Sequence, residues 1–287
     1  LRLITEIIFT SGRSRRGMNP TRAFMDGVLK YKTLFSQWEN PKNHFVYDDQ
    51  KRFLNFVFAG RPFPDDLPPG KPLNGLRSLE CEIMDWADDT AYSLNDLVDS
   101  TNAGFVTTGR IGRWAAEQDL SADDRKVLDA LLEAMAAGNL ERIMNRKIGE
   151  MVAACTLVER DNFMADLTNR YRFGMEIDPA AVREQKLYAK IARDLVFQSP
   201  QVCQLEHKGG FMLERLFGAL YDNYIGDNAA HHPLLSRAFE GEMAEATDDG
   251  VRARIICDYL AGMTDGFASR AYKRLFDPDF GSIVDLV

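Results

Sequence analysis

One stretch of the sequence, residues 82–99, places acidic side chains where they could bind a metal ion and a sugar. Asp88, Tyr92 and Asp96 are spaced four residues apart, so on a helix they lie along one side. Carboxylate oxygens are ligands for divalent cations, and a phenol or a second carboxylate can hydrogen-bond to a hydroxyl group. The spacing therefore suggests a ridge that holds a cation and recognises a sugar hydroxyl.

The simpler alternative is a core helix whose acidic side is merely solvated. At about 100° per residue, the apolar residues of this stretch share one broad face. The predicted apolar face consists of Ile83, Trp86, Ala87, Ala91, Leu94, Leu97 and Val98, and the other face carries Asp85, Asp88, Asp89, Tyr92, Asp96 and Asp99. Most amphipathic helices with a charged face bind nothing there, so pattern alone favours the alternative.

Two features of the acidic face count against simple solvation. Tyr92 lies in its middle, and a helix that is wet on that side gains little from an aromatic residue there. The face also carries no Lys or Arg, and like charges four residues apart destabilise an isolated helix by a few tenths of a kcal/mol, roughly, per pair. A bound cation or a basic partner surface would relieve that repulsion.

The length, composition and net charge of the chain restrict the class of protein. The chain has 287 residues, 45% of them hydrophobic, and a net charge of −8, so its surface as a whole repels nucleic acid. Its four cysteines are scattered and indicate reduced cytosolic thiols. No run of about 18 apolar residues is present, so we expect a cytoplasmic protein with no membrane partner. The chain opens without Met and already in helical register, and we expect it to begin within a domain.

The periodicity predicts an all-α fold, written as a single helical domain over residues 1–287. The acidic segment is predicted as a helix over about 76–101. Alternation of Val, Ile and Thr is nearly absent, so the only strands expected form a short hairpin near 105–110. Further helices are predicted over about 122–137, 139–172, 179–198, 201–223, 233–247 and 251–275.

Three segments, in order, resemble the deoxynucleoside triphosphate triphosphohydrolases of the HD superfamily. The family has an LRILT helix, then a GLNLT turn and a helix ending in LKY; here stand Leu1–Thr5, Gly17–Thr21 and Leu29–Tyr31. The family's ADDIAY…D matches residues 87–96. Its DYIAGMTD…A…Y…LF matches residues 258–276. The resemblance covers nearly the whole chain and implies an HD-like helical core with additional C-terminal helices.

The resemblance also implies an activity. Such enzymes cleave a deoxynucleoside triphosphate to the deoxynucleoside and inorganic triphosphate, through water activated by a divalent metal, here Mg²⁺ or Mn²⁺. Asp88 matches the last of the family's metal ligands, a carboxylate that follows a His and a His-Asp pair. Tyr92 and Asp96 match residues that line the deoxyribose pocket. Family members usually form tetramers or hexamers, so a homo-oligomer is expected.

The chain departs from the family in its histidines. It has only His44, His207, His231 and His232, and no His-Asp dipeptide. Three of the four ligands, and the acid–base residues that accompany them, therefore have no counterpart, and no catalytic residue is identifiable. Because a catalytic metal needs three or more ligands, we expect this chain alone to be inactive and to be the larger, C-terminal part of a longer enzyme.

Two other functions stay open at this point: a different HD-type phosphohydrolase, and a non-catalytic helical module that binds a nucleotide. Cations for a triphosphate could come from the loop with Arg13, Arg15 and Arg16, or from the middle of the chain. The mid-chain candidates are Arg170, Tyr171, Arg172, Arg183, Lys186, Tyr188, Lys190 and Arg193. Each of these has an ordinary structural explanation, as a solvated loop or a helix surface.

Overall fold

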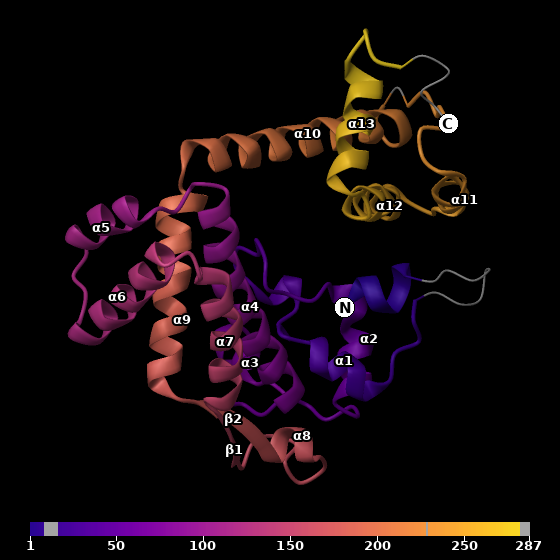
Figure 1. The fold of residues 1–287 in the computed structure, drawn as a ribbon. Coiled ribbons are helices and arrows are strands. Elements are labelled where there is room, and N and C mark those ends of the chain that lie inside the picture. The colour runs from indigo at the N-terminus through magenta and orange to yellow at the C-terminus, as the bar shows by residue number, and fades with distance from the viewer. Residues whose placement is uncertain (9–16, 228, 282–287) are drawn as a thin grey trace. The chain divides into compact units, whose positions relative to one another are not determined.

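A computed structural model describes residues 1–8, 17–227 and 229–281. The chain divides into two compact units, Leu1–Phe197 and Gln198–Val287. Helices make up most of both units (Figure 1). The all-α fold class predicted from the sequence is confirmed, whereas the grouping of residues 1–287 into a single domain stays a prediction.

The first unit begins with short elements that surround a compact core. A π-helical turn spans Leu3–Ile7, and the helices α1, α2 and α3 span Arg22–Val28, Lys51–Val57 and Lys71–Gly75; 3₁₀ turns lie at Phe35–Gln37 and Asp48–Gln50. Apolar side chains from these segments and from the region near Tyr171 pack together as one cluster. Its buried members are Met25, Leu29, Leu34, Val46, Leu54, Val57, Phe58, Leu76, Met164 and Tyr171.

Long helices form the rest of the first unit. α4 spans Leu79–Asn102, α5 Thr108–Ala116, α6 Ala122–Ala136, α7 Leu140–Ala153 and α9 Pro179–Ala192, and a π-helical turn at Arg193–Phe197 follows α9 directly. α4 packs against α1, α7 and α9, and Figure 1 shows it in the middle of this group. The helix that carries the acidic residues is therefore the central element of the unit.

The hairpin lies at a different place from the one predicted. Strands β1, Cys155–Glu159, and β2, Phe173–Ile177, pair antiparallel with Cys155 opposite Ile177, and the short helix α8, Asn169–Arg172, precedes β2. The prediction of a continuous helix over 139–172 is therefore wrong beyond Ala153. Residues 105–110, where strands were expected, instead lead into α5, with Thr107 as its N-cap. The run Thr156-Leu157-Val158 has the β-branched side chains typical of strands.

The second unit contains four helices in its described residues. α10 spans Pro200–Tyr224, α11 Arg237–Glu245, α12 Asp249–Ala261 and α13 Asp265–Phe276. The single helix predicted over 251–275 is thus two helices, since Thr264 caps a new one by accepting a hydrogen bond from the Phe267 amide. The core of this unit is formed by Leu220, Tyr224, Leu235, Met243, Ile255 and Ile256. No helix in the described part of the chain is both long and apolar enough to cross a membrane.

Candidate functional site

The helix α4 begins at a well-defined cap and carries the ridge of predicted site residues. The Ser78 hydroxyl accepts a hydrogen bond from the Cys81 amide at 3.4 Å, which satisfies one free donor of the first turn. No Gly or Pro interrupts the 24 residues that follow, so the helix stays regular. Residues four apart therefore align along one side, as the sequence predicted.

Two long-range hydrogen bonds fix the rotation of α4 about its axis. The Trp86 indole Nε1 donates to the Met151 carbonyl of α7 at 3.1 Å, and the Gln185 Nε2 of α9 donates to the Asp89 carbonyl at 3.1 Å. Further along the helix, Leu94 and Leu97 are fully buried. With the core side held in this way, the opposite side of α4 carries the acidic residues outward.

The ridge residues Asp88, Tyr92 and Asp96 differ in burial, but none of their side chains has a hydrogen-bond or ion-pair partner among the described residues. Asp88 is exposed, Tyr92 is 58% exposed, and Asp96 is partly buried. None of the three side chains makes a hydrogen bond or ion pair with any residue in the described part of the chain. The Asp96 Oδ2 atom is moreover removed from solvent without a donor, and such an acceptor costs about 1–3 kcal/mol until a donor reaches it.

The electrostatics around Asp96 disfavour its charge. Burial, and next the neighbouring Asp99 carboxylate, raise the pKa of Asp96 above its usual value. The last turn of α4 contains no basic residue, although cations, not anions, stabilise the C-terminal end of a helix. A hydroxyl group that donated a hydrogen bond to this carboxylate would favour its charged form.

Tyr92 has an aromatic neighbour that the sequence reasoning missed. The ring of Phe197 lies with its centroid 6.0 Å from that of Tyr92, at an interplanar angle of 33°. Phe197 ends the π-helical turn Arg193–Phe197, and such turns are frequent at functional sites. No sequence signal distinguishes a π-helical turn from the end of α9, so the residue could not be found from the pattern.

Asp85, one turn before Asp88, differs from it by forming ion pairs. Its carboxylate pairs with Lys30 Nζ and with Arg77 Nη1, and the hydrogen bond that Lys30 donates to Asp85 raises the pKa of Lys30. Only 19% of the Asp85 side chain is exposed. This carboxylate therefore joins α4 to the segments that precede it and is not free to take a ligand.

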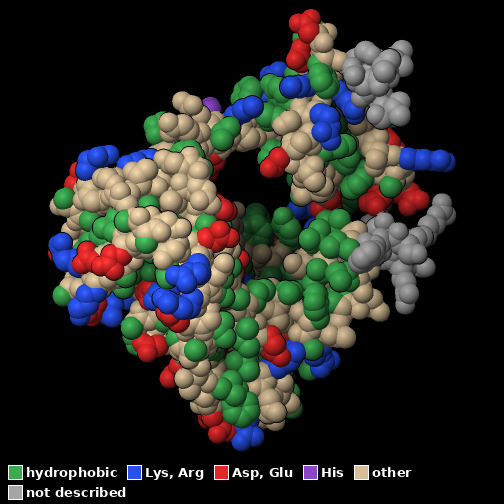
Figure 2. Space-filling model, in the orientation of Figure 1, with side chains coloured by type: hydrophobic (Ala, Val, Ile, Leu, Met, Phe, Trp, Pro, Cys, Tyr) green, Lys and Arg blue, Asp and Glu red, His purple; other side chains and the backbone are tan. Residues whose placement is uncertain are grey.

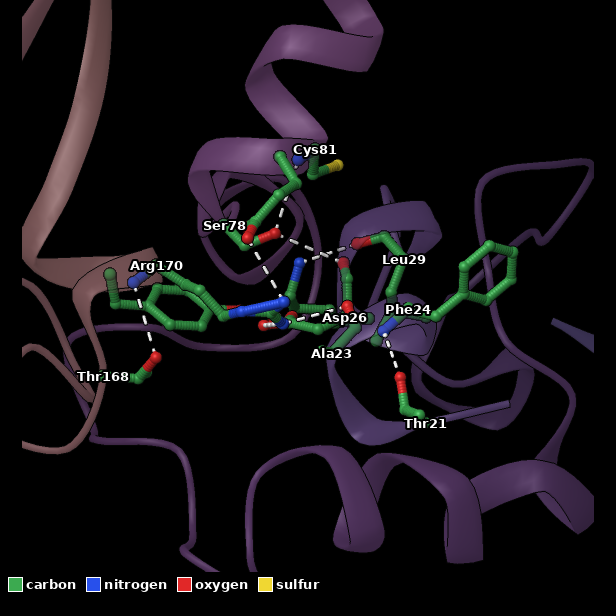
Figure 3. A network of polar contacts seen from close by, with 12 residues as sticks. Thr21, Ala23, Phe24, Asp26, Leu29, Ser78, Cys81, Thr168 and Arg170 are labelled. Atoms are coloured by element: carbon green, nitrogen blue, oxygen red, sulfur yellow. Dashed lines mark hydrogen bonds and ion pairs between the residues drawn. The ribbon is translucent and has the colours of Figure 1, made fainter. Parts of the chain in front are cut away.

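A network of buried polar groups holds the beginning of α4 against α1 (Figure 3). The Asp26 carboxylate accepts a hydrogen bond from the Tyr171 hydroxyl at 2.8 Å and lies 3.6 Å from Arg170 Nη1. Arg170 also pairs with Glu80 at 3.2 Å, and Ser78 donates to the Asp26 carbonyl. Burial raises the pKa of Asp26 despite the Tyr171 hydrogen bond. Arg170 and Tyr171, named above as candidate phosphate ligands, thus have structural roles.

Lys32 lies beside this network and is completely buried. Its Nζ donates to the Leu29 carbonyl at 2.9 Å, and burial lowers its pKa to about 8, against the opposing influence of Cys81 and Asp26. The pKa of Tyr171 is raised, first by burial and then by the Asp26 charge. These groups are ionisable but not accessible, so they cannot serve as a binding site.

The predicted apolar face of α4 is only partly correct. Trp86, Leu94 and Leu97 are buried, but Ile83 is 50% exposed and Ala87 and Ala91 are exposed as well. These three residues form an apolar flank beside the acidic ridge. Together with residues of α7 and β1, of which Val152 is 65% and Leu157 59% exposed, they line a groove of about 420 Å³.

The residues that the structure describes do not form a complete metal site. Within residues 1–8, 17–227 and 229–281, no group of three or more His, Cys, Asp or Glu side chains is placed to hold a metal ion. His44 stacks on Tyr31 with ring centroids 4.4 Å apart. Asp88 is therefore a single potential ligand, and a firmly held divalent ion needs several.

The other residues predicted as candidates for binding a triphosphate are distributed over the first unit. Arg172 pairs with Glu159 at 2.7 Å, and Tyr188 is buried and donates to Glu184 at 2.6 Å. Arg193 pairs with Asp194 at 3.1 Å. Arg183, Lys186 and Lys190 line a separate groove, and Arg13, Arg15 and Arg16 lie outside the described residues. No cation of this set pairs with Asp88 or Asp96 in the described part of the chain.

Comparison with known proteins supports the resemblance. Residues 175–274 match a family described as the phosphohydrolase-associated domain. A deoxyguanosinetriphosphate triphosphohydrolase-like protein of Shewanella loihica is 28% identical over 94% of this chain and 67% of its own length. A second such protein, from Deinococcus radiodurans, is 27% identical over 94% and 65%, and one from Aliivibrio fischeri is 26% identical over 91% and 65%.

The chain thus spans about two thirds of the length of the curated relatives that it matches. The matched region includes the helix α4 and most of the second unit, because it covers more than nine tenths of the chain. The order of the three resembling segments and the identities over most of the chain indicate the same group of proteins. The chain is therefore a relative of the deoxyguanosinetriphosphate triphosphohydrolase-like proteins, and the resemblance that its sequence indicated is confirmed.

Proposed function

We propose that α4 supplies the sugar-binding residues and one metal ligand of a deoxynucleoside triphosphate triphosphohydrolase. In this proposal Tyr92 and Asp96 bind the deoxyribose, and Asp88 is one ligand of a divalent ion, Mg²⁺ or Mn²⁺. The observation that carries it is the ridge itself: three polar side chains at steps of four that make no hydrogen bond or ion pair with the described residues. The names of the relatives support the choice of substrate class.

The surroundings of Tyr92 and Asp96 suit a sugar. The rings of Tyr92 and Phe197 offer an apolar surface of the kind on which a deoxyribose packs. The Asp96 carboxylate lacks a donor, and a sugar hydroxyl would supply one. Since protonation of Asp96 removes an acceptor and its pKa is raised, sugar binding should weaken as the pH falls through that raised pKa.

In this proposal the remaining metal ligands come from polypeptide other than the described residues, among which no group of three or more His, Cys, Asp or Glu side chains is placed to hold a metal ion. The chain alone should therefore bind a deoxynucleoside weakly and release no triphosphate. Without a complete ligand set, no chemical step can be assigned to its residues. What the chain contributes is recognition of the sugar and the position of one carboxylate.

Binding by the chain as it stands tests the sugar assignment. Isothermal titration with 2′-deoxyguanosine and dGTP should give weaker binding for Tyr92→Ala and Asp96→Asn, by about fivefold each for one lost hydrogen bond. The control is Asp129→Asn, which removes an exposed aspartate from α6. Equal affinities for the chain and the two ridge variants would refute the assignment.

Activity tests the metal assignment, in a protein that joins this chain to the remainder of a triphosphohydrolase-like sequence. With Mg²⁺ or Mn²⁺ such a protein should convert dGTP to deoxyguanosine and inorganic triphosphate, and Asp88→Ala should abolish the reaction. Release of orthophosphate or pyrophosphate would instead favour another HD-type phosphohydrolase. Binding without any turnover would favour a non-catalytic nucleotide-binding module, which is also consistent with the incomplete ligand set.

A further inference from the structure

A second groove, distinct from the ridge on α4, lies between α9 and the start of α6. Its volume is about 550 Å³, which is within the usual range of small-molecule sites. Gln185, which hydrogen-bonds to α4, lies on a different side of α9 from the groove-lining residues, at about 100° per residue. The groove and Asp88 are therefore reached from different sides of α9.

Three cations of α9 line this groove. Arg183, Lys186 and Lys190 are spaced three and four residues apart, which places them on one side of the helix. Figure 2 shows Lys and Arg side chains gathered over the region of α6 and α9, on the left of the view. Like charges at these spacings repel one another, so a bound anion would stabilise this row of cations.

The three cations differ in how strongly each is already paired with other residues. Arg183 Nη2 lies 3.5 Å from Asp123 Oδ2, a distance too long for a strong hydrogen bond. Lys190 Nζ donates to Gln118 Oε1 at 2.8 Å and lies 5.6 Å from the centroid of the Trp114 ring. Lys186 is exposed and forms no hydrogen bond or ion pair with the described residues. Lys186 is therefore the cation most available to a ligand.

The wall opposite the cations carries acceptors, and apolar residues also line the groove. Asp119 and Asp124 face the cations across the groove. Asp124 accepts two hydrogen bonds from Ser121, at 3.1 Å from its amide and 2.6 Å from its hydroxyl, whereas Asp119 is exposed and has no partner in the described part of the chain. Leu120, next to Asp119, and Val182, on α9, add apolar surface to the groove. A purely anionic ligand would be repelled by the acidic wall.

We propose that this groove binds a phosphorylated sugar, either free or as part of a nucleotide. The phosphate binds Lys186 with Arg183 and Lys190, because charge-assisted hydrogen bonds to phosphate are the strong ones. The sugar hydroxyls donate to Asp119, and the ring lies over Leu120 and Val182. Inorganic phosphate uses only one wall of the groove, and an uncharged sugar uses only the other.

Isothermal titration of the whole chain tests this assignment with four probes: ribose 5-phosphate, inorganic phosphate, ribose and dGMP. Ribose 5-phosphate should bind more tightly than inorganic phosphate or ribose. Lys186→Ala should weaken its binding by about tenfold, Lys186→Arg should preserve it, and Lys208→Ala, which removes an exposed lysine of the second unit, should leave it unchanged. Tighter binding of dGMP than of ribose 5-phosphate by the Asp96→Asn chain, in which the proposed sugar site on α4 is weakened, would identify the nucleotide as the source of the phosphate.

The position of binding is checked by NMR. Ligand should shift the indole resonance of Trp114, the ring next to Lys190, more than those of Trp38 and Trp86. Asp96→Asn should not alter the affinity for ribose 5-phosphate, so failure of the proposed sugar site on α4 leaves this prediction intact. Absence of saturable binding at millimolar ribose 5-phosphate, or equal affinities for Lys186→Ala and the unaltered chain, would overturn the proposal.

Discussion

Two groups of residues in the first unit both contain carboxylates and a phenol, but they differ in whether these side chains have partners. In the partnered cluster, formed by Asp26, Asp85, Tyr171 and Lys32 with their neighbours, each ionisable side chain has a hydrogen bond or an ion pair. On the open ridge of Asp88, Tyr92 and Asp96, no side chain has either among the described residues. One helical turn of α4 separates Asp85 from Asp88.

The difference teaches how to separate structural from functional carboxylates. A carboxylate that is half-buried and paired contributes to stability, and its removal leaves uncompensated charge. A carboxylate that is exposed and unpaired contributes little, and on a helix with like-charged neighbours it destabilises. A ridge whose side chains have no structural partner is a better candidate for binding than the same residues within a network.

The largest expected effect is at Asp85. Asp85→Asn leaves Lys30 and Arg77 without their carboxylate, and we expect a loss of about 2–3 kcal/mol in the free energy of unfolding. Asp88→Asn should change it by about 0.5 kcal/mol or less, since an exposed unpaired charge is lost. Urea denaturation at pH 7 measures both. Equal destabilisation by the two substitutions would remove the distinction between cluster and ridge.

Next in size is the pH dependence from Lys32. Its pKa is about 8 in the folded chain and near 10.5 when unfolded, so between these values the unfolded state binds the extra proton. Stability should therefore rise by about 2 kcal/mol from pH 7 to pH 9.5. Lys32→Met should lack that rise, and comparing the two unfolding curves cancels the titration of the other groups. Parallel curves would show that Lys32 is not desolvated.

The smallest expected effect compares two phenols. Tyr171→Phe removes the hydrogen bond to the buried Asp26 and should destabilise the chain by about 1–2 kcal/mol. Tyr92→Phe removes a hydroxyl that has no partner among the described residues, so its free energy of unfolding should stay within about 0.5 kcal/mol. Thermal unfolding of both variants at pH 7 is sufficient. A destabilised Tyr92→Phe would place that hydroxyl in the folded network.

Much of this organisation could be predicted from the sequence. The acidic helix was expected over about 76–101 and is observed at Leu79–Asn102, because a long run without Gly or Pro has few alternatives. Periodicity predicted the all-α fold class, and the spacing of four predicted that Asp88, Tyr92 and Asp96 share one side of this helix. The hairpin was missed, since a five-residue strand following directly on α7 looks like more of the same helix.

What the sequence could not reveal was which charges meet. Asp85 and Asp88 are equivalent by pattern, and only the folded chain brings Lys30 and Arg77 to the first of them. Phe197 lies 105 residues after Tyr92 in the sequence, and the π-helical turn that brings the two rings together has no signature in composition. Contacts of this kind depend on tertiary packing, which local periodicity does not encode.

The apolar flank of α4 has a practical consequence for handling this polypeptide. Ile83, Val152 and Leu157 remain at least half exposed around one groove, and a contiguous apolar surface of this kind promotes self-association. The chain should adhere to phenyl-substituted chromatography resins in ammonium sulfate, because that salt strengthens apolar contact. A mild non-ionic detergent in the purification buffer should release it.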